Sequence, residues 1–296
     1  MRPLDPSLSG VLLVDKPTGM TSARAVSAVK RALPKKTKIG HTGTLDPLAS
    51  GLLVLMIGRA TRLSRYIGDL EKAYTATAKF GAVSDSLDAD GEVTALEGGL
   101  PRPVDIEAVL PDFTGEIEQV PPMASAIKVG GKRLYALHRE GKTVEREART
   151  VEVREFSLKD YDGETGTGEF FVRCGGGTYV RSLVADVAES VGSGAYLTAL
   201  RRESVGEFGV GEAVSPEGLS QDSLRDALLG PEAALAGMVE AEVEPEAARL
   251  VGNGRPLESF GEFGAVAVWC RGELLAVYRD DGRAARAEVV LCPATS

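Results

Sequence analysis

The stretch GHTGTLDPLASG, from Gly40 to Gly51, decides how the rest of the chain is interpreted. Its glycines let the backbone approach a ligand closely, and its composition predicts a loop. Asp46 precedes Pro47, which pushes it into an extended or turn conformation at the edge of that loop. The carboxylate is therefore a candidate nucleophile or base, although it could also only stabilise the turn. His41 could hydrogen-bond a substrate or simply hold the loop.

The N-terminal part around this loop predicts alternating strands and helices. A helix begins at Thr21 or Ser22 and ends before Pro34. Residues 72–81 alternate, with Tyr74 on the apolar face, which predicts a half-buried strand. Tyr74 is thus either an ordinary core residue or an exposed aromatic surface for a ligand. The other expected elements in this part are strands at 10–15 and 52–57, a short helix at 61–67 and an acidic turn at 84–92.

The later sequence predicts a second group of elements and a domain boundary. The composition shifts to Ala, Glu, Pro and Gly around residues 230–246, so we divide the chain into domains 1–235 and 236–296. Beyond the boundary, short apolar runs separated by Gly turns predict a small β-rich module. The expected helices are 106–113, 134–139 and 179–191; the expected strands are 125–129, 151–158, 169–174, 265–270, 274–278 and 288–291; 196–204 is a strand or a short helix.

Composition excludes several classes of protein. The 296 residues are 43% hydrophobic and 26% charged, which is typical of a globular protein and excludes a mostly disordered chain or a coiled coil. No apolar run approaches the roughly 20 residues of a membrane helix. The three cysteines are widely spaced and only two histidines exist, so we expect no metal site and a reducing cytoplasm. A phosphate-binding G-x-x-x-x-G-K-[ST] loop is also absent from the sequence.

The net charge of −9 hides a basic N-terminal region. Residues 1–72 hold 12 Lys or Arg and 5 Asp or Glu, a balance of +7, whereas residues 232–296 have a balance of −5. Such a local field can attract phosphates while the rest of the surface stays acidic. A solvated basic face is the alternative. The candidate phosphate contacts are Lys35, Lys36, Lys38, Arg59 and Arg62.

Five ordered motifs resemble those of the TruB-type tRNA pseudouridine-55 synthases. The segment around Asp46 resembles the family's catalytic motif, and the resemblance extends from about residue 9 to 215. The flanking motifs are Leu12–Ser22, Lys72-Ala73-Tyr74, Pro121–Lys128 with Arg133-Leu134-Tyr135, Gly177–Leu183 and Leu200-Arg201-Arg202. The resemblance implies an α/β (α+β) pseudouridine synthase fold, with a mixed, largely antiparallel sheet flanked by helices. It also implies, more weakly, a small PUA-like RNA-binding domain at the C-terminus.

The resemblance also assigns site residues. Asp46 matches the catalytic aspartate, Arg181 the arginine that pairs with it, and Tyr74 the tyrosine that stacks on the target base. Tyr179 and Leu200 match positions lining the uridine pocket, and His41 matches a histidine that inserts into the T-loop. Arg181 could instead be an exposed arginine contacting phosphate. His138 stands where a small residue is expected, and we assign it no role.

The implied reaction converts uridine 55 in the tRNA T-loop to pseudouridine. The N-glycosidic bond breaks, the flipped base rotates, and it is rejoined through C5. One carboxylate suffices because the base is retained and no water enters, unlike in glycoside hydrolysis. Attack at C1′ and proton abstraction to a glycal both remain open. We expect the tRNA T-arm as partner, no cofactor, no membrane, no obligatory protein partner and a monomer. The rivals are a synthase acting on another RNA and a non-catalytic RNA-binding protein.

Overall fold

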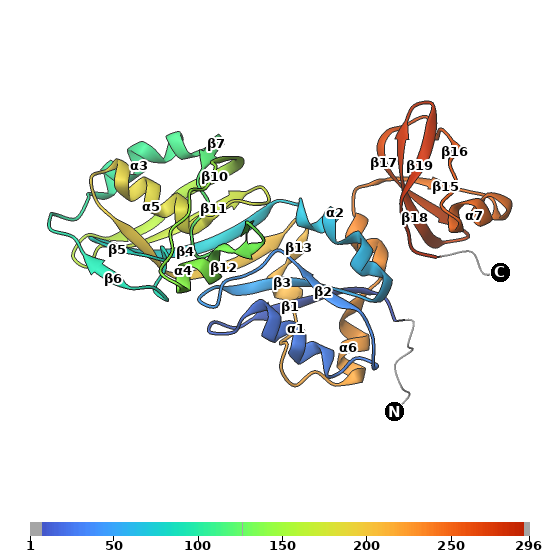
Figure 1. Cartoon of the computed structure of the whole chain (residues 1–296), viewed down its shortest axis with the longest axis horizontal. Coiled ribbons are helices and arrows are strands. Elements are labelled where there is room, and N and C mark those ends of the chain that lie inside the picture. Colours follow the sequence, from blue (N-terminus) through green and yellow to red (C-terminus); the bar gives the residue numbers. More distant parts are fainter. Residues whose placement is uncertain (1–7, 126, 293–296) are drawn as a thin grey trace.

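A ten-stranded sheet forms the larger part of the computed structural model, which describes residues 8–125 and 127–292 (Figure 1). Its one parallel pair among the described residues joins β12 to β3, so the expectation of a mixed, largely antiparallel sheet is confirmed. Along the sheet the strands are β14 (Leu228–Leu229), β1 (Gly10–Lys16), β3 (Ser50–Ile57), β12 (Ala195–Val205), β4 (Lys72–Phe80), β11 (Thr167–Cys174), β10 (Arg149–Asp162) and β7 (Gly115–Gln119), with β2 (Ile39–Thr42) on β3 and β13 (Phe208–Gly209) on β12.

Helices and short hairpins surround this sheet. The α-helices are α1 (Ser22–Lys30), α2 (Ser64–Gly68), α3 (Pro103–Val109), α4 (Leu134–Arg139), α5 (Val180–Ser190) and α6 (Gln221–Ala227). The 3-10 helices are η1 (Gly58–Leu63), η2 (Leu110–Phe113), η3 (Val210–Glu212) and η4 (Pro231–Leu235). The hairpins are β5 (Ala82–Ser84) with β6 (Val93–Ala95) and β8 (Lys128–Val129) with β9 (Lys132–Arg133). Figure 1 shows α3 and α5 together on one side of the sheet.

A separate five-stranded sheet forms the C-terminal module, as expected. Its strand order is β15 (Val239–Glu242), β17 (Phe263–Cys270), β18 (Glu273–Asp281), β19 (Ala284–Val290) and β16 (Leu257–Glu258), with α7 (Pro245–Gly252) beside it. The proposed division at residue 235 falls at the end of η4, before β15. In Figure 1 this sheet stands at the far end of the molecule, beyond α2.

Strands β1 and β3 are buried on both faces. Alternate residues of β1, Leu12 and Val14, belong to the core beneath α1 and α5, while Val11 and Leu13 belong to a second apolar cluster. This second cluster continues through η1, α2 and η4 to the C-terminal sheet, where it includes Val277. The sequence shows the reason, because both strands are continuous apolar runs.

The alternation expected for residues 72–81 is confirmed in β4. Tyr74, Ala76, Ala78 and Phe80 are buried, whereas Thr75 on the opposite face is exposed. β4 lies between β11 and β12, so it is a central strand. Residues 196–204, for which the sequence allowed two states, are strand because β12 pairs with β4 along most of its length.

Three expected boundaries were wrong. The loop 40–51 begins as strand, because residues 39–42 pair with the end of β3 and satisfy backbone groups that β12 leaves unpaired there. The helix expected at 106–113 starts at Pro103, a favourable first helical residue, and tightens into η2 at Leu110. The expected helix at 61–67 is η1 followed by α2.

The strand expected at 125–129 is also shorter than predicted. Only Lys128 and Val129 form strand, pairing with β9, and Ala126 lies outside the described residues.

Candidate active site

Asp46 lies in the tight connection between β2 and β3, and α1 holds that connection in place. The Ser22 hydroxyl at the start of α1 accepts from the Leu45 N–H and donates to the Leu45 carbonyl, both at 2.9 Å. The Gly19 N–H donates to the Pro47 carbonyl at 2.7 Å. Gly51 has φ +97°, and a side chain there would collide with the backbone of Arg202. The carboxylate therefore projects from a rigid support.

Arg181 is the ion-pair partner of Asp46. Its Nη2 lies 2.9 Å from Asp46 Oδ2, and its Nη1 lies 3.2 Å from Asp88 Oδ2. Nη2 also donates to the Ala124 carbonyl at 2.8 Å, and Nη1 donates to the Ser86 carbonyl. The Arg181 side chain is only 3% exposed, whereas Asp46 is 34% exposed. The planar guanidinium thus aims a partly accessible carboxylate, which argues against an exposed arginine contacting phosphate.

Burial and ion pairing act on Asp46 in opposite directions. Burial raises the pKa of its carboxyl group, and the neighbouring Arg181 guanidinium works against that rise. Lys16, buried at the end of β1, has its pKa lowered to about 8 by burial, although the Asp46 charge opposes this. Its ammonium donates to the Met20 carbonyl at 2.6 Å. Two cations therefore favour the ionised form of Asp46.

A small cavity of about 230 Å³ brings the predicted uridine-pocket residues together. Asp46, Arg181, Tyr74, Tyr179 and Leu200 all line it. Five residues assigned from four separate motifs thus line one cavity, and they come from the β2–β3 connection, α5 and its N-cap, β4 and β12. We call this space the small cavity.

Buried polar contacts fix two walls of the small cavity. Arg202 is 1% exposed; its Nε donates to the Leu52 carbonyl at 2.7 Å and its Nη2 to the Gly43 carbonyl at 3.1 Å. Burial raises the pKa of Tyr74, and the nearby Arg202 guanidinium opposes that rise. The Gln119 amide accepts from the Tyr179 N–H at 2.8 Å and donates to the Tyr179 carbonyl at 3.1 Å.

His41 faces a neighbouring, larger cavity of about 760 Å³, which meets the small cavity at Asp46 and Arg181. Its Nδ1 is buried and has no hydrogen-bond partner within the described part of the chain. Burial lowers the pKa of His41, with Arg202 adding to the effect. His138 lines the same cavity, with its Nε2 3.3 Å from Asp85 Oδ2. No pattern in the sequence predicts a charged partner for His138.

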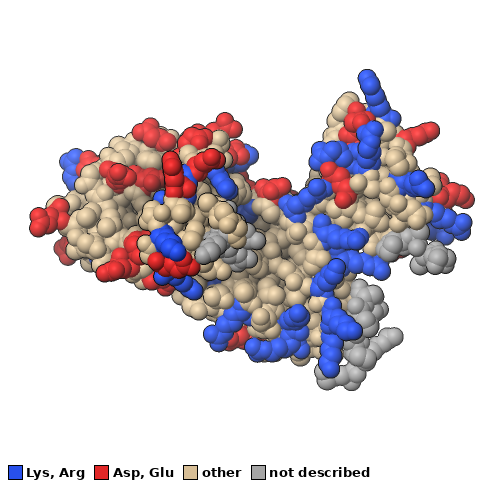
Figure 2. Space-filling model, in the orientation of Figure 1, with Lys and Arg blue, Asp and Glu red and all other residues tan. Residues whose placement is uncertain are grey.

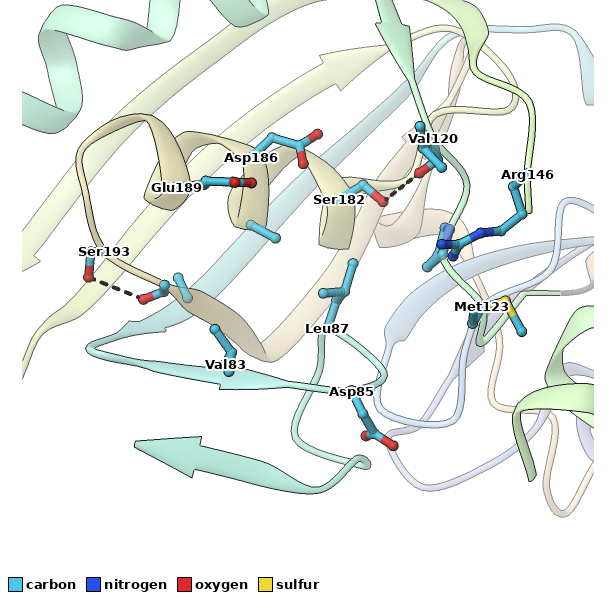
Figure 3. Close-up of a pocket in the computed structure, with 14 residues that line it drawn as sticks. Val83, Asp85, Leu87, Val120, Met123, Arg146, Ser182, Asp186, Glu189 and Ser193 are labelled. Atoms are coloured by element: carbon cyan, nitrogen blue, oxygen red, sulfur yellow. Dashed lines mark hydrogen bonds between the residues drawn. The ribbon is translucent and has the colours of Figure 1, made fainter. Parts of the chain in front are cut away.

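A third cavity, of about 560 Å³, lies along α5 and contains none of the predicted site residues (Figure 3). Asp186 and Glu189 extend from α5 beside it, and Ser182 donates to the Val120 carbonyl at 3.4 Å. Burial, together with the Glu189 charge, raises the pKa of Asp186 to about 6. In the part of the chain that the structure describes, no three His, Cys, Asp or Glu residues are grouped to hold a metal ion.

The two groups of candidate phosphate contacts differ in their surroundings. Lys35, Lys36 and Lys38 are exposed between α1 and β2. Arg59 and Arg62 contact the C-terminal module instead: Arg59 Nη1 lies 4.0 Å from Cys292 Sγ, and Arg62 donates to the Val290 carbonyl. In Figure 2, Lys and Arg gather over the region around α1 and α2 and also on the C-terminal module, whereas acidic side chains are densest at the end of the large sheet near α3, β5 and β6.

Sequence reasoning gave no role to four residues that organise the site: Lys16, Asp88, Gln119 and Arg202. Lys16 and Arg202 belong to motifs already quoted for the resemblance, so each had a signal. Asp88 lies in the acidic turn at 84–92, where nothing distinguished it from its neighbours. Its position depends on a long-range contact, because the Ala89 N–H donates to the Leu197 carbonyl of β12 at 2.8 Å.

Comparison with known proteins identifies the class of protein to which this fold belongs. The family described as "TruB family pseudouridylate synthase (N terminal domain)" matches residues 30–180. The structure resembles that of a Cbf5-Nop10-Gar1 complex, with a TM-score of 0.70 and 25% identity over 96% of this chain and 85% of that one. The fold is that of a pseudouridine synthase.

Curated relatives define the family. The chain is 43% identical to tRNA pseudouridine synthase B of Azoarcus sp. (strain BH72), covering 91% of this chain and 90% of that protein. It is 44% identical to tRNA pseudouridine synthase B of Burkholderia lata, covering 97% and 89%. The chain therefore belongs to the TruB family of pseudouridylate synthases. None of its described helices has the length and apolar character needed to cross a membrane.

Proposed function

We propose that this protein isomerises uridine 55 in the T-loop of tRNA to pseudouridine, with Asp46 as the catalytic carboxylate. The observation that carries the proposal is the 2.9 Å ion pair between Asp46 and the buried Arg181, set in a small cavity that Tyr74 also lines. The curated relatives support the substrate class, since they are named tRNA pseudouridine synthase B.

Asp46 is suited to chemistry at the sugar. It either attacks C1′ or removes a sugar proton to give a glycal; in both routes the N1–C1′ bond breaks and the uracil is retained. The base then rotates and C5 bonds to C1′; Asp46 leaves C1′ in the first route and returns the sugar proton in the second. The C5 proton leaves and N1 gains a proton. No atoms are added or lost overall, so a second carboxylate to activate water is unnecessary. Arg181 keeps Asp46 ionised and oriented before the first step.

Tyr74 is proposed to contact the extruded base. A uridine in folded RNA must leave its stack before its glycosidic bond is accessible. The Tyr74 ring lies in the small cavity with Asp46, and stacking on an aromatic ring is worth ~1–3 kcal/mol per base. Tyr179 and Leu200 line the same space. His41, in the adjoining larger cavity, is placed to contact the T-loop beside the flipped nucleotide.

The wider setting follows from the same proposal. The T-arm of tRNA is the partner, bound through shape and phosphate contacts, and the exposed Lys35, Lys36 and Lys38 supply part of the basic surface. We propose a monomer acting in the cytoplasm, with no obligatory protein partner. The C-terminal module is proposed to add a modest RNA contact, because its charge balance is −5.

The decisive experiment measures pseudouridine in an unmodified T-arm stem-loop treated with native protein or Asp46→Asn. Native protein should place pseudouridine at the T-loop uridine, and the variant should be at least about 1,000-fold slower while still binding RNA. Asp112→Asn, an exposed carboxylate of η2, is the matched control and should behave like native protein.

Three outcomes would contradict the proposal. Undiminished product from Asp46→Asn would exclude Asp46 as the catalytic group. Product elsewhere in total RNA but not in the T-loop would favour a synthase of different specificity. If native protein and both variants bind tRNA tightly but none of them forms product, a non-catalytic RNA-binding protein would be favoured.

A further inference from the structure

Lys72, the first residue of β4, is a buried cation that neither the proposed chemistry nor the base contacts use. It is 6% exposed and lines the small cavity. Its ammonium donates to the carbonyls of Gly68 and Leu70. Lys72 and Tyr74 are two residues apart on one strand, so their side chains share a face. Whatever touches Tyr74 in the small cavity is therefore close to Lys72.

The small cavity has more positive than negative side chains. Among the described residues that line it, Lys72, Arg181 and Arg202 are cationic and Asp46 is the one carboxylate. Asp46 is already paired with Arg181. A buried cation without a counter-ion is unfavourable, and this imbalance fits a ligand that carries negative charge.

The surroundings of Lys72 supply little compensation. The neighbouring Cys174 is a neutral thiol, because burial raises its pKa to about 11. Burial lowers the pKa of Lys72, with Arg202 adding to the effect and the exposed Asp69 opposing it weakly. Glu71 is engaged by Arg154 at 2.9 Å and by Arg173 at 3.5 Å. A bound anion would restore the favourable environment that the ammonium lacks.

The backbone around Lys72 leaves room for such an anion. Besides Lys72, Gly68, Gly175, Gly177 and Thr178 line this part of the small cavity. A side chain at Gly176 would lie 2.9 Å from the Gly68 carbonyl oxygen and 3.4 Å from Lys72 Nζ, so glycine is needed for the backbone to pack closely beside the Lys72 ammonium. The glycine segment leads into α5, whose N-cap, Tyr179, makes no side-chain capping bond within the described structure. The positive end of the α5 dipole therefore faces the same region.

We propose that Lys72 is a positioning residue that binds a phosphodiester group flanking the target uridine, while Tyr74 contacts the base. This inference rests on the proposed function and names how the substrate backbone enters the site. The phosphodiester supplies one negative charge to a cavity that holds three cations and one carboxylate. By fixing the backbone on one side of the sugar, Lys72 places C1′ relative to Asp46.

The test pairs a protein variant with a substrate from which one charge has been removed. T-arm stem-loops carry either natural phosphates or a single uncharged methylphosphonate on the 5′ or the 3′ side of the target uridine. Each is treated with native protein and Lys72→Met, which keeps the length of the side chain but not its charge. Lys79→Met is the matched control, because Lys79 is on the opposite face of β4 and donates to the Thr165 carbonyl.

One methylphosphonate should lower kcat/KM of native protein about tenfold to a hundredfold, the range expected for a lost hydrogen bond to a charged group. Lys72→Met should show a similar loss on the natural stem-loop and no further loss on that methylphosphonate. Lys79→Met should match native protein on all three substrates. Lys72→Met should also melt as native protein does, since a loss from unfolding would appear equally on every substrate.

Two results would overturn the phosphate assignment. One is that Lys72→Met lowers kcat/KM by the same factor on the natural stem-loop and on both methylphosphonate stem-loops. That result is expected if the ammonium contacted a uracil oxygen or only stabilised β4. The other is equal kcat/KM of native protein on all three stem-loops, which decides the question even if Lys72→Met fails to fold. Absence of product from native protein on the natural stem-loop would instead overturn the proposed function.

Discussion

The basic residues that line the small cavity and the basic residues of the exposed segment between α1 and β2 look alike in the sequence, but they differ in burial and in hydrogen-bond partners. Arg181 and Arg202 are almost completely buried, and each donates to several defined acceptors. Lys35, Lys36 and Lys38 are exposed in a connection between α1 and β2. The buried groups act through fixed geometry, whereas the exposed group acts through a field that salt screens. Substitutions should therefore affect catalysis in the first region and affinity in the second.

The exposed charges themselves divide into two kinds. Arg62 and Arg65 belong to the same basic N-terminal region as Lys38, yet both extend to the C-terminal module, where Arg62 donates to the Val290 carbonyl and Arg65 pairs with Glu288. Glu288 also accepts from Arg279 at 2.6 Å and from the Tyr66 hydroxyl at 2.9 Å. A basic residue that already has a carboxylate partner contributes less to phosphate binding. The comparison thus separates charges that hold the protein together from charges available to RNA.

Among the basic residues of the two regions, the largest effect is expected for Arg181→Lys. Lysine keeps the positive charge but lacks the planar fork that reaches Asp46, Asp88 and the Ala124 carbonyl together. We expect the single-turnover rate of pseudouridine formation to fall at least about 100-fold, because Asp46 loses its fixed orientation. Arg173→Lys, at an exposed ion pair with Glu71, is the control and should keep native activity. A native rate for Arg181→Lys would show that charge alone is sufficient inside the cavity.

A smaller effect is expected when Lys35, Lys36 and Lys38 are all replaced by Ala. The affinity for tRNA should fall about tenfold, and the slope of log affinity against log salt should flatten by about two to three units, since up to three phosphate contacts are lost. Titration of labelled tRNA at several salt concentrations measures both. The double variant Arg59→Ala with Arg62→Ala should flatten the slope less. An unchanged slope for the triple variant would remove that segment from the RNA interface.

The smallest effect concerns Asp186, a half-buried carboxylate outside the site. Its pKa is raised from 3.8 to about 6 in the folded protein, so the folded state binds the proton more tightly than the unfolded state. Stability should therefore fall as pH rises from about 4 to 6, by about 1–3 kcal/mol at most. Urea unfolding at pH 4.5 and 7 should show that Asp186→Asn lacks this loss, whereas Asp112→Asn retains it. If the stability of Asp186→Asn depends on pH as that of native protein does, the Asp186 carboxyl group is solvated and its pKa is not raised in the folded protein.

Much of the fold could be predicted because its patterns are local. The alternation in β4 and the two-sided apolar runs of β1 and β3 are visible in sequence, and Pro34 marks the helix end. Strand β2 was missed because it is only four residues long, contains Gly40 and is defined by its pairing with β3. The start of α3 was missed because Pro103, rather than a hydrophobic pattern, defines it.

The candidate site was predicted unevenly for a related physical reason. Asp46, Tyr74 and Arg181 came from motifs, and the structure brings them into one cavity. Asp88 depends on a turn held against β12 by a backbone hydrogen bond, and no local pattern reports that contact. Likewise, the partners of Arg59 and Arg62 are more than 200 residues away in sequence. The number of charged residues can be counted from the sequence, but the partner of each charged side chain is known only from the fold.

The apolar cluster that joins one face of β1 and β3 to the C-terminal sheet has a consequence for how the molecule unfolds. Because Leu13, Leu235 and Val277 belong to one cluster, melting of the C-terminal module would expose hydrophobic surface on the larger part. The C-terminal module and the larger part should therefore unfold cooperatively, in a single transition. A chain that ends at residue 235 would expose the apolar face of β1 and β3 and would tend to self-associate, although every residue of the small cavity would still be present.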